Sequence, residues 1–155
     1  RSKVEAEKIL QATEGLNFSI VRTIIVYGQG EQLSRSNLIL WAKEALQQGN
    51  PLQIVNDQFR APTWADDLAW ACVRICELSH VGIFHIAGPK VLSIYDIVAR
   101  VAAFYKLPME QVTQLSSDSL KQPAKRPART GFVLDKANEL LGYCPHTLEQ
   151  TFALM

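Results

Sequence analysis

The fold of this 155-residue chain is decided by the stretch Ser19-Ile20-Val21-Arg22-Thr23-Ile24-Ile25-Val26. The stretch has strand length, is rich in β-branched residues, and is apolar enough to be buried on both faces. Strands buried on both faces are typical of parallel sheets, because the crossover connections of such sheets place helices on either side. The stretch therefore predicts a parallel strand in an α/β protein.

Patterns typical of helices flank this strand. Before it, residues 3–13 have helical spacing. We expect their apolar stripe to face a core, and the stripe consists of Val4, Ala6, Ile9 and Leu10. After it, a polar stretch ends at Ser36 and Asn37, and either residue could cap the next helix.

The rest of the chain alternates between strand-like and helix-like segments, which supports an α/β fold. Strands are predicted at 52–55, 82–87 and 112–115. Helices are predicted at 38–46, 64–78, 93–105 and 135–141, the last capped by Asp135, and from about Thr147 onward. A loop is expected at 57–63, because Pro62 prevents a simple strand or helix.

Composition limits the classes of function. With 48% hydrophobic and 20% charged residues, the chain has the balance of a globular protein with room for at most one full-size domain. Its net charge of +1 argues against nucleic acid or an anionic membrane as the main partner. No apolar run approaches the roughly 20 residues that span a bilayer. We therefore expect a cytoplasmic protein with no nucleic-acid or membrane partner.

The cysteines and histidines give little sign of chemistry. An odd number of cysteines, three, argues against a disulfide framework. Cys72 and Cys76 share one helix face and could be metal ligands, but their neighbours are apolar, so we predict that both pack in the core and that there is no metal site. We assign catalysis to no histidine and expect His85, in an apolar strand, to be a hydrogen-bonded structural residue.

Two arginines in predicted loops are the best candidates for binding. The sequence contains no G-x-G-x-x-G, P-loop, G-x-S-x-G or H-E-x-x-H motif. Arg60 lies in D-Q-F-R-A-P-T and Arg126 in K-R-P-A-R-T-G, each close to a proline. Two guanidinium groups from separate loops would suit the diphosphate of a nucleotide-sugar. The alternative is that both are surface arginines that pair with Asp57 or Asp66.

Four ordered motifs resemble the C-terminal half of the extended short-chain dehydrogenase/reductases that act on nucleotide sugars, most closely the dTDP-4-dehydrorhamnose reductase family. R-S-K-V-E-A-E-K-I-L (1–10) is similar to the helix after that family's catalytic tyrosine, and I-V-R-T-I-I-V-Y-G (20–28) to its next strand and turn. D-Q-F-R-A-P-T-W-A-D-D-L-A (57–69) resembles its substrate-domain signature. K-R-P-A-R-T-G-F-V-L-D-K-A-N-E-L-L-G-Y (125–143) is similar to its closing motif.

The resemblance implies the C-terminal part of a Rossmann-like NAD(P)-binding fold together with the small α/β substrate-binding domain. Residues 1–34 would be the last helix and strand elements of the dinucleotide-binding domain. Residues 35–155 would be mainly the nucleotide-sugar domain, with 52–87 partly returning to the Rossmann sheet. Because the chain opens inside an expected helix, we expect it to be the downstream part of a longer polypeptide.

The resemblance also implies roles for individual residues. Lys3 matches the lysine of the Tyr-x-x-x-Lys motif, which in the family holds the nicotinamide ribose and lowers the pKa of the tyrosine. That tyrosine would fall two residues before Arg1. The residues expected beside the cofactor are Lys3, Thr23, Ile25 and Val26. The residues expected at the nucleotide-sugar are Asn37, Gln58, Arg60 and Arg126, with the two arginines at its diphosphate. The rhamnose reductases often have Trp in place of Ile25, which leaves the sugar open.

The implied function is reduction of a 4-keto nucleotide-sugar, expected to be dTDP-linked, by NADPH or NADH, in a protein that could be a homodimer. This chain alone, without the tyrosine and the glycine-rich motif, is expected to be inactive. An epimerase or dehydratase of nucleotide sugars is an alternative of the same class. A non-catalytic regulatory subunit resembling the methionine adenosyltransferase β-subunit is an alternative of another class. The residues upstream of Arg1 would discriminate between these alternatives.

Overall fold

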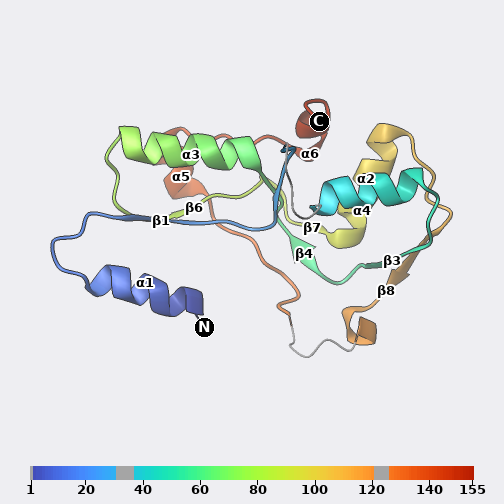
Figure 1. Cartoon of the computed structure of the whole chain (residues 1–155), viewed down its shortest axis with the longest axis horizontal. Coiled ribbons are helices and arrows are strands. Elements are labelled where there is room, and N and C mark those ends of the chain that lie inside the picture. The colour runs from blue at the N-terminus through green and yellow to red at the C-terminus, as the bar shows by residue number, and fades with distance from the viewer. Residues whose placement is uncertain (1, 31–36, 121–125) are drawn as a thin grey trace.

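The computed structural model describes residues 2–30, 37–120 and 126–155, and it confirms the predicted α/β class (Figure 1). The helices are α1 (Ser2–Ala12), α2 (Leu38–Gln47), α3 (Ala65–Glu77), α4 (Ile94–Tyr105), α5 (Asp135–Leu141) and α6 (Leu148–Phe152), with a 3-10 turn η1 (Ser117–Leu120). The strands are β1 (Ser19–Arg22), β2 (Val26–Tyr27), β3 (Leu52–Val55), β4 (Phe59–Arg60), β5 (Thr63–Trp64), β6 (Gly82–His85), β7 (Leu92–Ser93) and β8 (Val112–Leu115).

The strands pair two by two within the described residues. β1 pairs with β6, β2 with β5, and β3 with β8, and each of these pairs is parallel. β4 and β7 form an antiparallel pair. Arg22 lies opposite His85 in the register of the first pair, so β1 and β6 end at the same edge. Parallel pairing is what the apolar stretch around Val21 predicts.

The predicted strand at 19–26 is broken by a bend, so the prediction of one continuous strand is wrong. β1 ends at Arg22, and Ile25 has a φ of +36°, a region that β-branched residues rarely adopt. Buried Thr63 holds the bend: its N–H donates to the Ile25 carbonyl (3.1 Å) and its hydroxyl to the Ile24 carbonyl (2.7 Å). These bonds offset a backbone cost on the order of 1–3 kcal/mol. The bend moves the chain from pairing with β6 to pairing with β5.

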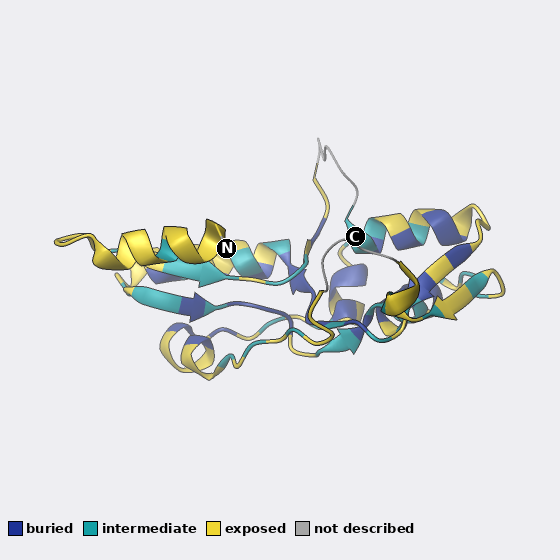
Figure 2. Cartoon of the chain, turned by 90° about the horizontal axis from the view of Figure 1, so that it is seen from below, coloured by how far each residue is buried: buried dark blue, intermediate teal, exposed yellow. Residues whose placement is uncertain are grey.

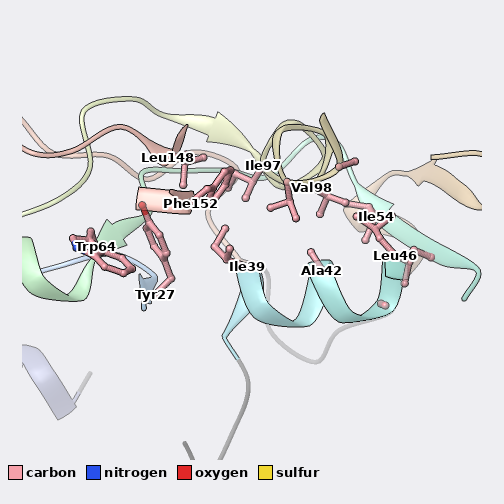
Figure 3. Close-up of a cluster of buried hydrophobic side chains, with 14 residues drawn as sticks. Tyr27, Ile39, Ala42, Leu46, Ile54, Trp64, Ile97, Val98, Leu148 and Phe152 are labelled. Carbon is pink, nitrogen blue, oxygen red and sulfur yellow. The ribbon is translucent and has the colours of Figure 1, made fainter. Parts of the chain in front are cut away.

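Two clusters of buried apolar side chains lie on either side of this bend. The larger cluster packs α4 against α2, β3 and α6 (Figure 3). Its largest fully buried members include Tyr27, Ile39, Ile97, Val98, Val101 and Phe152. The smaller cluster packs α3 and α5 on β6, and consists of Ala71, Ile75, Phe84, Ile86, Ala137, Leu141 and Tyr143. The chain passes between the clusters more than once.

One buried hydrogen bond joins distant parts of the larger cluster. The hydroxyl groups of Tyr27 and Thr151 lie 2.8 Å apart, and both residues are almost fully buried. Burial raises the pKa of Tyr27 to about 12, so its hydroxyl keeps its proton at neutral pH. α6, which carries Thr151, begins with a capping box in which Thr147 and Gln150 bond each other's backbone N–H groups, as the predicted helix start near Thr147 requires.

The apolar stripe of α1 is not buried, which contradicts the prediction that it faces a core. α1 has no buried residue (Figure 2). Val4 and Ile9 are 54% and 68% exposed. Its single partly buried residue is Glu7, which lies toward β1. Within the described residues α1 is therefore held to the sheet by a polar contact and not by apolar packing. The continuous apolar stretch at 19–26 is likewise only partly buried, because β1 has only β6 beside it in the described structure.

The prediction that Cys72 and Cys76 pack in the core is wrong, because both are exposed, as is Cys144. The buried face of α3 is instead the i, i+4 series Asp67, Ala71 and Ile75. The buried positions are therefore shifted by one residue from the expected series that contains Cys72 and Cys76. The shift arises because a buried aspartate, Asp67, belongs to the inner face of the helix. An apolar pattern alone could not reveal this.

Two smaller predictions also need correction. The loop expected at 57–63 contains strand residues at 59–60 and at 63, because β4 pairs with β7 and β5 pairs with β2. The residue that precedes α5 as its N-cap is Leu134, with no side-chain cap bond, and Asp135 is the first helical residue. The Asp135 carboxylate still lies at the positive end of the helix dipole. Among the residues that the structure describes, no helix is long and apolar enough to cross a membrane.

Asp67 ties α3 to the segment before α6, and its loss should be costly. One carboxylate oxygen accepts the backbone N–H of His146 (2.9 Å), and the other lies 2.6 Å from His146 Nδ1. We expect Asp67→Ala to lower the free energy of unfolding by about 1–3 kcal/mol, because the hydrogen bonds that the buried carboxylate makes to His146 are lost. Urea unfolding of Asp67→Ala beside Asp66→Ala measures this. Asp66 shares the first turn of α3, so equal losses in the two variants would contradict the prediction.

Candidate functional site

Arg60 is a buried cation at the end of β4. Its side chain is held by backbone carbonyls and one amide: one terminal nitrogen donates to the carbonyls of Phe59 (2.7 Å) and Ala128 (3.3 Å), and the other to Gln58 Oε1 (3.3 Å). Arg60 is 8% exposed and Gln58 is 7% exposed. Because these partners are neutral, they satisfy N–H groups without neutralising the charge.

A backbone connection brings the closing motif to Arg60. The Phe59 N–H donates to the Ala128 carbonyl (2.7 Å), and the Thr130 N–H donates to the Phe59 carbonyl (3.0 Å). Phe59 and Arg129 therefore form an isolated parallel bridge. The Arg129 guanidinium also lies over the Phe59 ring, with its carbon 5.5 Å from the ring centroid. The segment that carries Arg126 thus runs beside β4, although the two are more than 60 residues apart in the sequence.

The charges of Arg60 and Arg126 influence each other. Burial lowers the pKa of Arg60, and the positive charge of Arg126 lowers it further. Arg126 is exposed. The structure therefore brings together the arginines of the two predicted loops, one buried and one at the surface. The guanidinium group keeps its charge at any physiological pH, so this region concentrates positive charge.

The carboxylates offered as alternative partners are elsewhere. Asp57 accepts the backbone N–H of Ser117 together with the hydroxyl groups of Ser116 and Ser117, and these bonds, led by the backbone one, lower its pKa. Over residues 2–30, 37–120 and 126–155, no carboxylate oxygen lies within 4.0 Å of a nitrogen of Arg60 or Arg126. The surface-pair alternative is thus wrong for Arg60, which is buried and has no such partner in the described chain.

Asn37 is the N-cap of α2, as predicted, whereas Ser36 lies outside the described residues. Its Oδ1 accepts the backbone N–H groups of Ile39 and Leu40, both at 3.1 Å. Its Nδ2 donates to the Gly28 carbonyl at 2.7 Å, just after β2. The amide therefore fixes the start of α2 against the turn that follows β2.

The residues expected beside the cofactor lie at the bend after β1. The Thr23 hydroxyl donates to the hydroxyl of Thr63 (3.0 Å), Ile25 has the left-handed backbone, and Val26 is 41% exposed. This is the edge where β1 and β6 both end. In open α/β sheets, ligands bind outside the carboxyl ends of the strands. Thr63 is three residues after Arg60, so a short stretch of chain connects Arg60 to the bend.

Lys3 is exposed in the first turn of α1. α1 runs alongside β1 in the opposite direction, so its N-terminal end lies toward the strand's carboxyl end (Figure 1). Of the predicted site residues, Gln58, Arg60 and Arg126 are grouped, and Thr23, Ile25 and Val26 follow β1 directly. Lys3 and Asn37 lie at the starts of two different helices, α1 and α2.

Two residues near the end of β1 were not singled out by the sequence analysis: Glu7 and Arg22. The Glu7 carboxylate accepts from Arg22 through both oxygens, and this hydrogen bonding lowers the pKa of Glu7 and raises that of Arg22. His85, expected to be structural, has Nε2 3.4 Å from an Arg22 terminal nitrogen, and its pKa is lowered by burial and then by Arg22. The sequence feature that could have indicated this ion pair is Arg22 itself, a charged residue inside an otherwise apolar strand.

Metal ligands are not grouped in the part of the chain that the structure describes: no three His, Cys, Asp or Glu side chains are placed to hold an ion together. The residues of this chain provide contacts for only part of a dinucleotide cofactor. The exposed ammonium of Lys3 and the strand ends at Thr23 and Val26 could contact its nicotinamide and ribose. The sequence contains no glycine-rich strand-turn-helix to receive its pyrophosphate.

Comparison with known proteins gives a consistent family. A family model described as the RmlD substrate binding domain matches residues 1–155. A dTDP-4-dehydrorhamnose reductase of Sinorhizobium fredii is 30% identical, with 92% of this chain and 50% of the relative covered. Methionine adenosyltransferase 2 subunit beta of Danio rerio is 25% identical, with coverage of 92% and 45%. The chain thus spans half or less of the length of these curated relatives.

Solved structures share the fold. A dTDP-4-dehydrorhamnose reductase from Clostridium acetobutylicum has a TM-score of 0.84 at 24% identity, with 99% of this chain and 54% of that chain covered. The dTDP-4-dehydrorhamnose reductase from Bacillus anthracis, solved in complex with NADP, has a TM-score of 0.80 at 19% identity, with the same coverage. At these identities the likeness establishes the fold.

Proposed function

Because the chain belongs to the RmlD substrate-binding domain family, we propose that it forms the C-terminal part of an NAD(P)H-dependent reductase of a 4-keto nucleotide-sugar. The chain covers half or less of each of the two curated relatives, so in this proposal another part of the full-length protein binds most of the cofactor. A dTDP-linked substrate is favoured by the name of the relative that is 30% identical, a dTDP-4-dehydrorhamnose reductase. The single observation that carries the proposal is the buried, positively charged Arg60 with Arg126 beside it.

A buried cation needs an anion, because desolvation of a charge is costly unless the charge is paired. In the described residues Arg60 has only neutral acceptors, namely two carbonyls and the Gln58 amide. A diphosphate would supply the missing charge, and a guanidinium can fork two hydrogen bonds onto its oxygens. Arg126, at the surface, would bind the same diphosphate from the solvent side. We assign Gln58 and Asn37 to the same ligand.

The residues near the carboxyl end of β1 would form the other half of the site, which binds the cofactor. Lys3 would contact the nicotinamide ribose and, as a cation, favour ionisation of the tyrosine that precedes it in the family motif. Thr23, Ile25 and Val26 would form the wall beside the nicotinamide and the sugar. NADPH or NADH, when bound, supplies the hydride. Thr23, Ile25 and Val26 would hold the nicotinamide and shield it from water on their side, while Lys3 would hold the ribose.

We also propose the division of the chain that the resemblance implies. Residues 1–34 would complete the dinucleotide-binding domain, residues 35–155 would be mainly the substrate domain, and residues 52–87 would partly return to the Rossmann sheet. The two buried clusters support a division of this kind, because α3 and β6 belong to the smaller cluster and α2, β3 and α4 to the larger. α5 packs with α3 and β6, so a late segment also returns to the smaller cluster.

Two alternatives have specific support. Relatives named methionine adenosyltransferase 2 subunit beta favour a non-catalytic regulatory subunit. Structural neighbours that include a UDP-glucuronic acid 4-epimerase favour an epimerase or dehydratase of nucleotide sugars. Fold alone does not separate these functions. A cytoplasmic location and a homodimer stay predictions from the sequence.

The experiment uses the full-length protein. We expect it to oxidise NADPH or NADH when dTDP-4-dehydrorhamnose is added, and to leave both cofactors unchanged without the sugar. Conversion of UDP-sugars or of dTDP-glucose without net consumption of reduced cofactor would support the epimerase or dehydratase alternative. Stoichiometric co-purification with a methionine adenosyltransferase catalytic subunit, without turnover of any sugar, would support the regulatory alternative.

A further inference from the structure

α1 is fixed to the sheet through one carboxylate. Glu7 is the single described residue of α1 that is not exposed, with a side chain 20% exposed. Its Oε1 accepts from Arg22 Nε at 2.9 Å, and its Oε2 accepts from a terminal nitrogen of the same guanidinium. A pair with two parallel bonds fixes orientation as well as distance. The contact therefore sets both the position of α1 along β1 and its rotation about its own axis.

Arg22 is itself held from the opposite side. It is the last residue of β1, and His85 is the last residue of β6, directly opposite in the register. The second terminal nitrogen of Arg22 lies 3.4 Å from His85 Nε2. The His85 ring stacks on Phe132, with centroids 4.3 Å apart and planes inclined by 14°. A continuous set of contacts thus runs from Phe132 through His85 and Arg22 to Glu7.

Lys3 and Glu7 are four residues apart on α1, so they share one face of the helix and are separated by one turn. That separation is roughly 6 Å along the helix axis. Glu7 bonds to Arg22, the last residue of β1, and α1 runs alongside β1 in the opposite direction, so its N-terminal end lies toward the carboxyl end of that strand (Figure 1). Lys3 therefore lies one helical turn from Glu7, on the side of the carboxyl end of β1.

We infer that Glu7 is a positioning residue for Lys3, and that Arg22 and His85 hold Glu7 in place. The inference rests on the proposed function, because it concerns the Lys3 side chain in the reductase. Apolar packing does not perform this task in the described structure, since the apolar residues of α1 are exposed. The ammonium group of Lys3 thus depends for its location on an ion pair one turn away.

The test is Glu7→Gln in the full-length protein, with Glu5→Gln as the matched control. Glu5 is on the same helix, loses the same charge, and pairs with Lys8 at the surface (3.4 Å). We expect Glu7→Gln to lower kcat roughly 10-fold, as small misplacements of a catalytic group do. The KM for the nucleotide-sugar should change less than about twofold, because Glu7 is remote from the arginines that bind the sugar. Glu5→Gln should behave like the wild type.

Two further measurements separate positioning from a general loss of stability. In the Lys3→Met background, Glu7→Gln should reduce kcat no further, because the group that it positions is gone. Hydrogen exchange of the α1 amides, measured without cofactor or substrate, should be faster in Glu7→Gln than in Glu5→Gln. Exchange of α4, in the larger cluster, should be the same in both variants.

Each of the following outcomes would contradict the inference about Glu7. An unchanged kcat in Glu7→Gln, while Lys3→Met loses activity, overturns the inference and leaves the proposed function standing. If Glu7→Gln lowers kcat by the same factor in the Lys3→Met background as in the wild type, the inference is also overturned. Such a loss would not depend on Lys3 and would be a general structural effect. Equal α1 exchange in the two glutamine variants overturns it as well. Absence of reductase turnover in the wild type overturns the proposed function and the inference together.

Discussion

Replacing Arg60 with alanine in the full-length protein is expected to weaken binding of a dTDP-linked sugar by about 10- to 150-fold, or about 1.5–3 kcal/mol, the range for charge-assisted hydrogen bonds. Arg126→Ala should give a loss in the same range. The affinity for NADPH should barely change in either variant, because the arginines lie in the part of the site assigned to the sugar. Isothermal titration calorimetry with each ligand measures both affinities.

Arg74→Ala is the matched control for these variants. Arg74 is a surface arginine on α3 that pairs with Glu77 at 3.2 Å, so its loss removes the same charge from the protein at a distance from the site. Its sugar affinity should equal that of the wild type. Unchanged sugar affinity in Arg60→Ala and Arg126→Ala would remove the diphosphate assignment. An equal loss of sugar affinity in all three variants, Arg74→Ala included, would show that the effect comes from net charge and not from contacts with the diphosphate.

Lys3→Met is expected to lower kcat by about 100-fold, at the lower end of what general acid-base assistance provides. Without the ammonium group, the family's tyrosine is less readily ionised and its pKa rises. The protonated tyrosine then persists to higher pH, so the optimum of the pH-rate profile should shift upward. Steady-state rates of NADPH oxidation across a range of pH measure both effects.

Lys8→Met controls for the loss of charge and the gain of an apolar side chain on α1. Lys8 is exposed and pairs with Glu5 on the solvent side of the same helix. Its rate and pH profile should match those of the wild type. A normal pH profile in Lys3→Met would count against the role assigned to Lys3, whatever happened to the rate.

Local signals in the sequence were sufficient for many helix starts. Asn37, one of the two predicted cap candidates, caps α2, and Ser93 forms a capping box with Asp96 at α4, where a helix is predicted from residue 93. Caps depend on residues two or three positions apart, so the sequence contains all the information needed. The α/β class was predictable for the same reason, since strand and helix periodicities are local properties.

Contacts between distant segments were not predictable in this way. Nothing near Phe59 indicates that its backbone pairs with β7 and also bonds to residues 128–130. The bend at Ile25 depends on Thr63, which is 38 residues away. The phase of α3 depends on Asp67, whose partner His146 belongs to another segment. Each of these features arises from tertiary contacts that override local propensity.

The candidate site shows the same contrast. Arg60 and Arg126 could be selected from their sequence context, but only the fold places the two charges near each other. The Glu7–Arg22 pair could have been suspected from an arginine at the end of an apolar strand, but its partner could not be identified. The binding roles of Lys3 and of the residues around the arginines stay predictions.

The buried bond between Tyr27 and Thr151 has a consequence for synthesis of the protein. The two residues are 124 positions apart, and Phe152 beside Thr151 fills the same cluster. At about 5–20 residues per second, a ribosome needs roughly 6–25 s to add the intervening residues. Until then the apolar faces of α2 and α4 lack one of their covering elements. A nascent chain that does not yet include α6 therefore exposes apolar surface of α2 and α4 to chaperones. In the complete protein this surface is covered.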